Sequence, residues 1–390
     1  MHLPTCSDQD RAFFALLEQH PDLDERDNRG KKHALALVLT GVIMALLAGR
    51  DGNLSAIQRH MKNHFNPLCQ SLCLQVTRVI SRAQLPRLLA CVNYTRLAAL
   101  VQQHYGLNLP ARGTAEDVDH WLSGDGKELR GSIANGQQRG EVCVSLVAQT
   151  TEAVVAQAYY NGTKESERAC LSKLLTEKGL LGRKIVLDAL HLVPTLLDAI
   201  HLASGTYLIG LKANQWLLRR LCLIQTMLHK PLLERVDAPK RAHGRIEERT
   251  YGCYSLVGLS LDKRWAKSGL TKVVVVTRLR RTLAGVETAR TVSYFVTNQS
   301  VVSQSEADGL YDAIRGHWRI ETMHHRRDVV LAEDDCRSRF SGLQRTLSSL
   351  RTLTLSLLHS LNPTNMAAQL DDFADHVQGL IDFLRLKRVL

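Results

Sequence analysis

The stretch "RKIVLDALHLVPTLLDAIHLASGTYLIGLK" (183–212) predicts a strand, a helix and a second strand in succession. Its two ends, "RKIVLDA" (183–189) and "TYLIGLK" (206–212), are short apolar runs of the kind found in buried strands. Between them, "PTLLDAIHLAS" (194–204) has apolar residues at helical spacing behind a proline, which suits the first turn of a helix. Strands that alternate with helices are typical of an α/β sheet.

The flanking sequence extends this sheet. Upstream, "EVCVSLVAQT" (141–150) and "AVVAQAYYNG" (153–162) are rich in β-forming residues and close enough to pair as a hairpin. "ESERACLSKLLTEKG" (165–179) predicts a helix that ends at Gly179, and "QWLLRRLCLIQTMLHK" (215–230) predicts another after the second strand. We therefore predict an α/β fold with mixed strand pairing.

Changes in patterning along the chain predict four segments. Residues 1–112 have helical patterning and form an all-α N-terminal domain, and residues 113–230 begin the sheet. Residues 231–303 contain β-like runs such as "KVVVVTRLRR", which predict an inserted sheet or a β-rich extension. Residues 304–390 return to helical patterning and supply the second part of the core and the C-terminal helices.

Composition narrows the class of partner. The formal charge of +12 and the isoelectric point near 9.4 favour a polyanion, although many basic enzymes bind none. Nine scattered cysteines indicate reduced thiols in a cytoplasm. The apolar run at 34–49 is shorter than the roughly 20 residues of a membrane helix, so we predict a buried helix there and no membrane partner.

Two aspartates lie where strands are expected to end. Asp125 in "WLSGDGKELRGS" (121–132) precedes a glycine, so it is either the corner of a hairpin or a metal-binding carboxylate. Asp188 follows the strand "KIVLD", a position where α/β folds place their sites, although it could equally cap the next helix. Adjacent strands could bring both carboxylates to one metal ion.

A third acid, Glu321, lies on a predicted helix in "RGHWRIETMHHRRD". If Trp318 and Ile320 face the core, Glu321 lies close to the sheet and needs a partner there, because an unpaired buried acid is costly. Carboxylates around divalent cations serve phosphodiester chemistry, and such hard ligands favour Mg²⁺, with Mn²⁺ as a substitute. Zinc remains an alternative, because His317, His324 and His325 cluster nearby.

Five blocks in this order, "DGKELRGS", "LDALHL", "LIGLKANQ", "HGRIEER" and "RGHWRIETMHHRRDVVLAEDDCRSR", resemble the DDE transposases of the ISAs-type insertion-sequence family, which includes the H-repeat-associated proteins. The resemblance spans nearly all the chain, including "DNRGKKHALALVLTGVIMALLAGRDG" (27–52). It implies a ribonuclease-H-like core with Asp125, Asp188 and Glu321 as the catalytic, metal-binding triad. The spacings are 63 and 133 residues, and the β-rich insertion precedes the last catalytic helix and accounts for the larger spacing.

The resemblance also suggests which residues contact DNA. Basic residues could neutralise phosphates, although charges on a solvated surface are the simpler interpretation. Trp318 could stack on an unpaired base, but we favour core packing for it. His243 and Arg245 are candidates because the "HGRIEER" block matches the family. The full set of predicted DNA contacts is Lys127, Arg130, Lys212, His243, Arg245, Arg315, Trp318 and Arg327.

We therefore expect a bacterial, cytoplasmic, nucleoid-associated DNA transposase that binds the terminal inverted repeats of an insertion sequence and catalyses Mg²⁺-dependent cleavage and strand transfer. Its partners would be double-stranded DNA, both element ends and target, and it would act as a homodimer, with the N-terminal helices binding DNA. Two alternatives remain: a transposase-derived DNA-binding protein, and a Mg²⁺-dependent nuclease without strand transfer.

Overall fold

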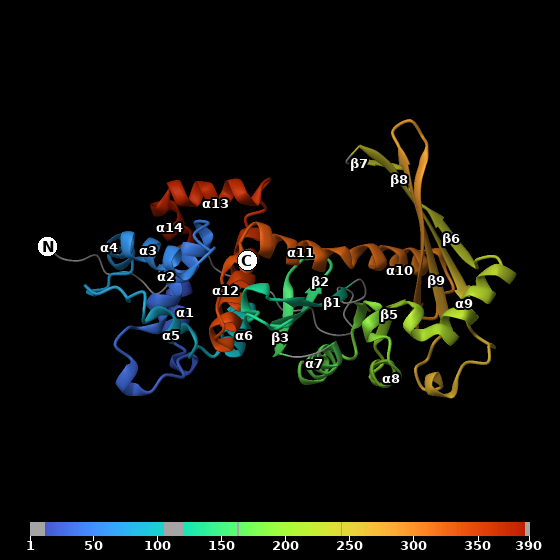
Figure 1. The fold of residues 1–390 in the computed structure, drawn as a ribbon, viewed down its shortest axis with the longest axis horizontal. Coiled ribbons are helices and arrows are strands. Elements are labelled where there is room, and N and C mark those ends of the chain that lie inside the picture. The colour runs from blue at the N-terminus through green and yellow to red at the C-terminus, as the bar shows by residue number, and fades with distance from the viewer. Residues whose placement is uncertain (1–11, 105–119, 162–163, 243, 387–390) are drawn as a thin grey trace.

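A ten-stranded mixed sheet runs through the middle of the molecule, in the order β3-β2-β1-β4-β5-β10-β9-β8-β6, with β7 paired to β8 (Figure 1). The computed structural model describes residues 12–104, 120–161, 164–242 and 244–386. The strands are β1 (Trp121–Glu128), β2 (Glu141–Ala148), β3 (Val154–Asn161), β4 (Lys184–Leu187), β5 (Thr206–Leu211), β6 (Leu233–Val236), β7 (Lys240–Ala242), β8 (Arg245–Ser255), β9 (Lys272–Thr282) and β10 (Glu287–Thr297).

Strand direction divides the sheet into two parts. β1, β4 and β5 are parallel, and β2 and β3 form the predicted hairpin on the far side of β1. β10 pairs antiparallel with β5 and is followed by β9, β8 and β6, all antiparallel. The predicted α/β class with mixed pairing is confirmed. The 231–303 segment is a β-rich extension of the same sheet and not a separate one.

Helices cover both faces of the sheet because its parallel strands are apolar on both sides. Ile185 and Leu187 pack in one cluster with residues of α7, α8 and α9, whereas Val186 between them packs in another with α10. α11 lies against β1 and β2 on the face of α10. These helices are α7 (Lys164–Glu177), α8 (Pro194–Leu202), α9 (Trp216–Leu228), α10 (Gln304–Gly316) and α11 (Trp318–Val329).

A helical body occupies one end of the molecule (Figure 1). The apolar run at 34–49 forms α2, whose residues are almost all buried, as predicted. No helix of the described chain is long and apolar enough to cross a bilayer. The helices of this body are α1 (Ala12–Glu18), α2 (Leu35–Leu47), α3 (Leu54–Asn63), α4 (Phe65–Ser71), α5 (Leu85–Leu89), α6 (Tyr94–His104), α12 (Ser341–His359), α13 (Met366–Asp375) and α14 (Val377–Leu386).

The N-terminal and C-terminal helices share one hydrophobic core. Leu39 and Ile43 of α2 are in the same buried cluster as Leu347 and Leu350 of α12. The predicted boundary near residue 112 lies outside the described residues. The described part of the N-terminal segment is helical, and its apolar surface is buried against the C-terminal helices.

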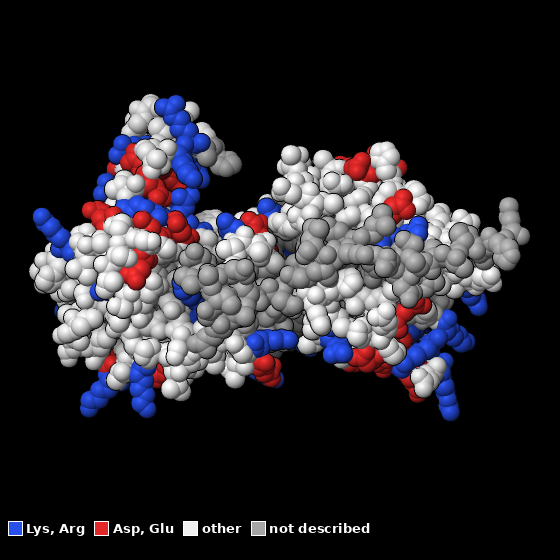
Figure 2. Space-filling view, turned by 180° about the vertical axis from the view of Figure 1, so that it is seen from behind, with Lys and Arg blue, Asp and Glu red and all other residues white. Residues whose placement is uncertain are grey.

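At the opposite end, the ends of β7, β8, β9 and β10 project from the body as a ribbon (Figure 1). Lys and Arg side chains gather along it, interleaved with acids (Figure 2). Glu247, for example, pairs with Arg249 and Arg278, and Arg280 lies within 3.8 Å. Much of the positive charge on this ribbon is therefore compensated internally.

Candidate active site in the acid cleft

Asp125 lies within β1 and not at its end. The strand continues to Glu128, and Asp125 pairs with Ser145 of β2 in an unbroken register, so the hairpin at Asp125-Gly126 is wrong. The two flanking glycines serve packing instead. A Cβ at Gly124 would lie 2.6 Å from Leu187, and one at Gly126 would lie 2.7 Å from Glu167. Neither glycine has the positive φ that a primed turn requires.

Asp188 lies immediately after β4, level with Asp125. The parallel register of β1 and β4 pairs Gly124 with Leu187, so the two aspartates occupy the next positions along neighbouring strands. The Asp188 carboxylate also accepts a 2.9 Å hydrogen bond from the Leu190 N–H and caps the 3₁₀ turn Ala189–His191. The expectation that Asp188 caps the helix of 194–204 is wrong, because Val193 is the N-cap of α8 and Asp188 caps only the short turn before it.

The Asp125 carboxyl is hard to ionise. Its pKa is raised to about 7, chiefly because the carboxyl is buried. The nearby charges of Asp188 and Glu167 also raise the pKa, whereas the Gly126 N–H and His191 lower it. About 30% of the side chain remains exposed, and His324 Nδ1 lies 3.6 Å from Asp125 Oδ2. A partly exposed acid in a field of other acids gains by binding a cation or a proton.

Glu321 on α11 faces the same cleft as Asp188. The cleft has a volume of about 510 Å³ and is lined by Asp188, Lys212, Arg219, Trp318 and Glu321, among others. Desolvation raises the pKa of Glu321. Ile320, its neighbour, is fully buried, as predicted.

Asp188 and Glu321 line one cleft, and Asp125 lies beside Asp188 on the neighbouring strand. Within the described residues, no group of three or more His, Cys, Asp or Glu side chains is placed to hold a metal ion, which applies to the zinc alternative as well. Asp125 and Asp188 nevertheless fit one side of a divalent-cation site, since they are oxygen donors on adjacent strands and like charge raises the pKa of Asp125. Glu321 approaches from the helix across the cleft.

Sequence reasoning missed Glu167 and His191 beside the aspartates. His191 is fully buried, and its Nε2 atom lies 3.4 Å from Glu167 Oε1 and 3.9 Å from Asp188 Oδ1. Neither ring nitrogen makes a hydrogen bond to any described residue. The signal that could have found it is "LDALH", which places a histidine three residues after the aspartate, but only the fold adds Glu167 from α7.

Two histidines lie near the acids: His317, the N-cap of α11, lines the cleft, and His324 within α11 lies beside Asp125. Burial lowers the pKa of His317 to about 4 and that of His324 to about 3, so both are neutral at physiological pH. His317 Nδ1 and His324 Nε2 have no hydrogen-bond partner among the described residues. Within the residues that the structure describes, Asp125 and Asp188 form ion pairs with histidines and not with lysine or arginine. Among the described residues, the two aspartates therefore lack a permanently charged partner.

Two predicted DNA contacts lie in this cleft. Lys212 follows β5 and lines it, and Trp318 lines it with 56% of its surface exposed. The expected core packing of Trp318 is wrong, because α11 buries Ile320 and Met323 and turns Trp318 outward. Arg219, which the sequence did not single out, adds a second cation to the lining.

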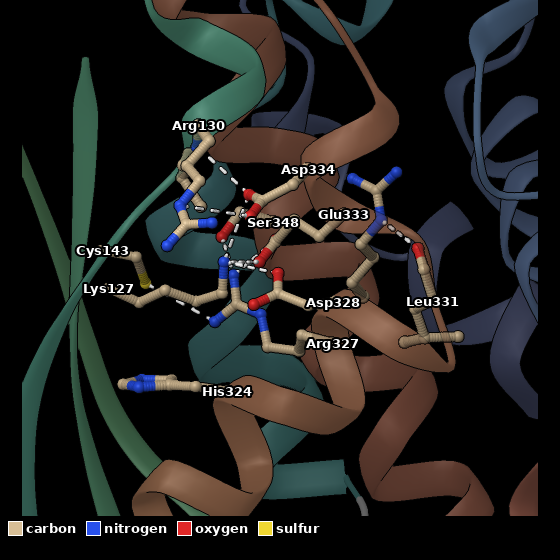
Figure 3. A network of polar contacts seen from close by, with 12 residues as sticks. Lys127, Arg130, Cys143, His324, Arg327, Asp328, Leu331, Glu333, Asp334 and Ser348 are labelled. Carbon is tan, nitrogen blue, oxygen red and sulfur yellow. Dashed lines mark hydrogen bonds and ion pairs between the residues drawn. The ribbon is translucent and has the colours of Figure 1, made fainter. Parts of the chain in front are cut away.

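Lys127 and Arg327 lie inside the protein, in the polar network of Figure 3. Lys127 is 7% exposed, and its ammonium lies 2.7 Å from Asp328 and 3.4 Å from both Glu333 and Asp334. Arg327 is fully buried and lies 2.5 Å from Glu333. Internal acids thus surround both charges, and neither side chain presents a free cation at the surface in this structure.

The network is electrostatically balanced. Burial alone would raise the pKa of Glu333, but the charges of Arg327, Arg351 and Lys127 lower it to about 2. Arg327 also donates to Ser348 of α12 and contacts Cys143 of β2. The network therefore ties α11 to β1, β2 and α12 directly behind the acid cleft.

The remaining predicted DNA contacts lie elsewhere. Arg130 is largely exposed at the start of the turn after β1, and Arg315 pairs with Asp237 at 2.8 Å on the rim of another cleft. Arg245 begins β8 on the projecting ribbon, and His243 lies outside the described residues. None of Arg130, Arg245 and Arg315 lines the cleft of Asp188 and Glu321.

No family profile matches the chain. Over 240 residues, 60% of the chain, it is 27% identical to "Putative protein YbfL" and to "H repeat-associated putative transposase YhhI", both from Escherichia coli K12, covering 62% of each. It is 25% identical, over 60% of both chains, to "Putative transposase YncI" from Escherichia coli O157:H7. The similarity thus spans about three fifths of the length of these relatives, two of which are named as transposases.

Proposed function

We propose that the protein is a DNA transposase that cleaves and joins DNA through Asp125, Asp188 and Glu321. The observation that carries the proposal is the placement of Asp125 and Asp188 abreast on neighbouring parallel strands, at an edge where α/β sheets bind ligands. The strand order β3-β2-β1-β4-β5, with β2 antiparallel to its two neighbours, supports a ribonuclease-H-like core. The names of two relatives and the charge of +12 support DNA as the substrate.

Asp125 and Asp188 would hold Mg²⁺ or Mn²⁺, with Glu321 approaching from α11. When bound, the ion would lower the pKa of an attacking water or 3'-hydroxyl and stabilise the leaving oxygen. The rigid pairing of β1 with β4 fixes the separation of the two aspartates, so these donors need little reorganisation. Lys212 and Arg219 would position the phosphates along the same cleft, and the exposed Trp318 would stack on an unpaired base.

DNA cleavage and DNA binding are separable in the proposal. Asp188→Asn removes a metal-binding charge while keeping the cap to Leu190, so cleavage of DNA that carries the element's ends should fall by roughly 10³-fold or more, in line with metal and electrostatic catalysis. Binding, measured by gel shift without divalent cations, should stay close to wild type. Asp371→Asn, an exposed position on α13, is the matched control and should cleave normally.

Three outcomes discriminate the candidates. Full cleavage by Asp188→Asn would refute the triad assignment. Cleavage by wild type without any joined product would favour the Mg²⁺-dependent nuclease. Binding without cleavage by wild type would favour the transposase-derived binding protein. A transposase must hold two ends together, so we further propose a homodimer on DNA in the bacterial nucleoid.

A further inference from the structure

A second cleft, away from the acids, lies between the helical body and the sheet. It has a volume of about 790 Å³. Its walls come from α3, α5, the turn after β1, and the segment 337–340 that leads into α12. The residues that line it include Arg130, Asp334, Arg337, Arg339 and Phe340.

The walls of this cleft are held by backbone contacts. The Ser338 N–H donates to the Gly131 carbonyl at 3.1 Å, and Gln344 donates to the carbonyls of both Cys336 and Ser338. A Cβ at Gly131 would lie 2.5 Å from the Cys336 oxygen, so the two segments approach as closely as glycine allows. The side chains of Arg337 and Arg339 therefore project from a fixed segment, which lowers the entropy cost of binding.

The charge of the cleft is positive. Arg337 and Arg339 are exposed, and neither forms an ion pair with a described residue. The acid in the lining, Asp334, lies 3.4 Å from Lys127 and accepts a 3.1 Å hydrogen bond from the Arg130 N–H (Figure 3). Its charge is thus largely compensated by the buried network, and the two arginines remain for an external anion.

The cleft also has an apolar side. Phe340 is 71% exposed, an unusual position for a phenylalanine, and Leu54, Pro86 and Ile133 line the wall with it. Phe340 is the N-cap of α12, whose first turn receives no side-chain cap, so positive helix-dipole charge lies at the same place. Arginines beside an exposed aromatic ring suit a nucleotide, which presents both a phosphate and a base.

We propose that this cleft binds a DNA strand at an unpaired nucleotide, with phosphates on Arg337 and Arg339 and a base on Phe340. The proposal rests on the proposed function and adds a contact outside the acid cleft. The volume is that of a small-molecule site and is too small for a duplex. Arg130 lies five residues after Asp125, so their Cα atoms are at most about 18 Å apart. One strand could therefore reach both clefts.

Fluorescence anisotropy with the full chain tests the cleft. The probes are a labelled DNA duplex with a single-stranded extension and the same duplex without it, each titrated over a range of salt concentrations without divalent cations. The double variant Arg337→Ala/Arg339→Ala should lower the slope of log K against log salt by about 1.4 to 1.8, as expected for two lost phosphate contacts. Phe340→Ala should weaken binding of the extended probe by roughly five- to 150-fold, the range for one stacked base, and leave the blunt probe unchanged.

The matched control removes two charges elsewhere. Lys263→Ala/Lys267→Ala lies in the exposed segment between β8 and β9, away from the helical body, and should leave binding of the extended probe unchanged. All substituted side chains are exposed, so the variants should keep the wild-type melting temperature.

An unchanged salt slope in the arginine double variant overturns the proposal. An equal loss of affinity for the two probes in Phe340→Ala overturns it as well. Polyglutamate tests the other occupant that two arginines could attract. If Arg337→Glu/Arg339→Glu abolishes polyglutamate binding but binds the extended DNA probe as wild type does, the cleft belongs to an acidic polypeptide and the DNA proposal is overturned.

The cleft and the transposase proposal fail in different ways. If the arginine double variant keeps the wild-type salt slope while wild type still cleaves DNA that carries the element's ends, only the cleft proposal is refuted. If wild type does not bind DNA at all, both proposals are refuted.

Discussion

Asp125 and Lys127 lie two residues apart on β1 and face the same helix, yet they belong to opposite electrostatic regions. Asp125 lies beside His324 of α11, and Lys127 pairs with Asp328 one helical turn further on. Beside the acid cleft, burial and the charges of neighbouring acids raise the pKa of Asp125. In the network, burial would also raise the pKa of Glu333, but the charges of neighbouring cations outweigh it and lower that pKa. Within the described chain, Glu333 pairs with Arg327 and Lys127, whereas the ion-pair contact of Asp125 is to His324, whose imidazole is neutral.

This difference separates structural acids from functional ones. Acids whose charge is matched internally hold α11 in place, and an added ion gains little there. Acids that repel one another at a concave surface remain available for an external cation. The comparison yields four predictions.

The largest effect is expected in the network. Arg327→Met leaves Glu333 with less compensation and should destabilise the fold by about 3–5 kcal/mol, measured as the free energy of unfolding in urea. The double variant Arg327→Met/Glu333→Leu removes both charges and should recover much of that loss. If the double variant were no better than the single one, the charge balance would not be what stabilises this region.

Asp125→Asn should stabilise the protein, and only at higher pH. The folded-state pKa of Asp125 is about 7 against 3.8 in a model compound, so the stability contributed by the neutral acid is present below pH 4 and is lost as pH rises through 7. At pH 8 without divalent cations the asparagine should therefore gain at most about 4 kcal/mol. At pH 4 the two proteins should unfold at the same urea concentration. A constant difference at both pH values would contradict the electrostatic account.

Mg²⁺ should stabilise the acid cleft and not the network. An ion that binds the folded state at roughly 100 times its dissociation constant adds about 2.7 kcal/mol to stability. We expect the melting temperature of wild type to rise with Mg²⁺ at pH 8 and that of Asp188→Asn to rise much less. Arg327→Met, if folded, should keep the Mg²⁺ response. Equal responses in all three proteins would place the ion elsewhere.

The smallest effect on stability is expected for Trp318→Ala. Its side chain is more than half exposed, so unfolding in urea should change by no more than about 0.5 kcal/mol. Binding of DNA with an unpaired base should nevertheless weaken, as anisotropy would show. Strong destabilisation would mean that Trp318 packs as the sequence first suggested.

The sequence predicted the strands and helices well where periodicity is local. The β2–β3 hairpin and the strand-helix-strand unit from β4 to β5 follow from patterns within short windows. The Asp125-Gly126 turn failed because a glycine required for close packing against Glu167 looks the same in sequence as a glycine required for a turn. Both interpretations depend on the missing Cβ, and only the fold distinguishes them.

The burial of charged side chains also could not be predicted from the sequence. Lys127 and Arg327 resembled phosphate contacts because their partners, Glu333 and Asp334, come from a turn after α11 that no local pattern connects to β1. The predicted core packing of Trp318 was wrong for a related reason, because the elements that pack against α11 decide which of its faces is buried. Glu167 could not be found at all, because only the packing of α7 brings it to Asp125.

The pairing of β10 with both β5 and β9 has a consequence for a nicked chain. The exposed tip between β9 and β10, with Leu283 and Val286 largely in solvent, is an accessible place for a protease. A cut there would put β9 in one fragment and β10, with the helix of Glu321, in the other. Because the broken hairpin is still paired along both strands and β10 is also paired to β5, the two fragments should stay together as a split protein.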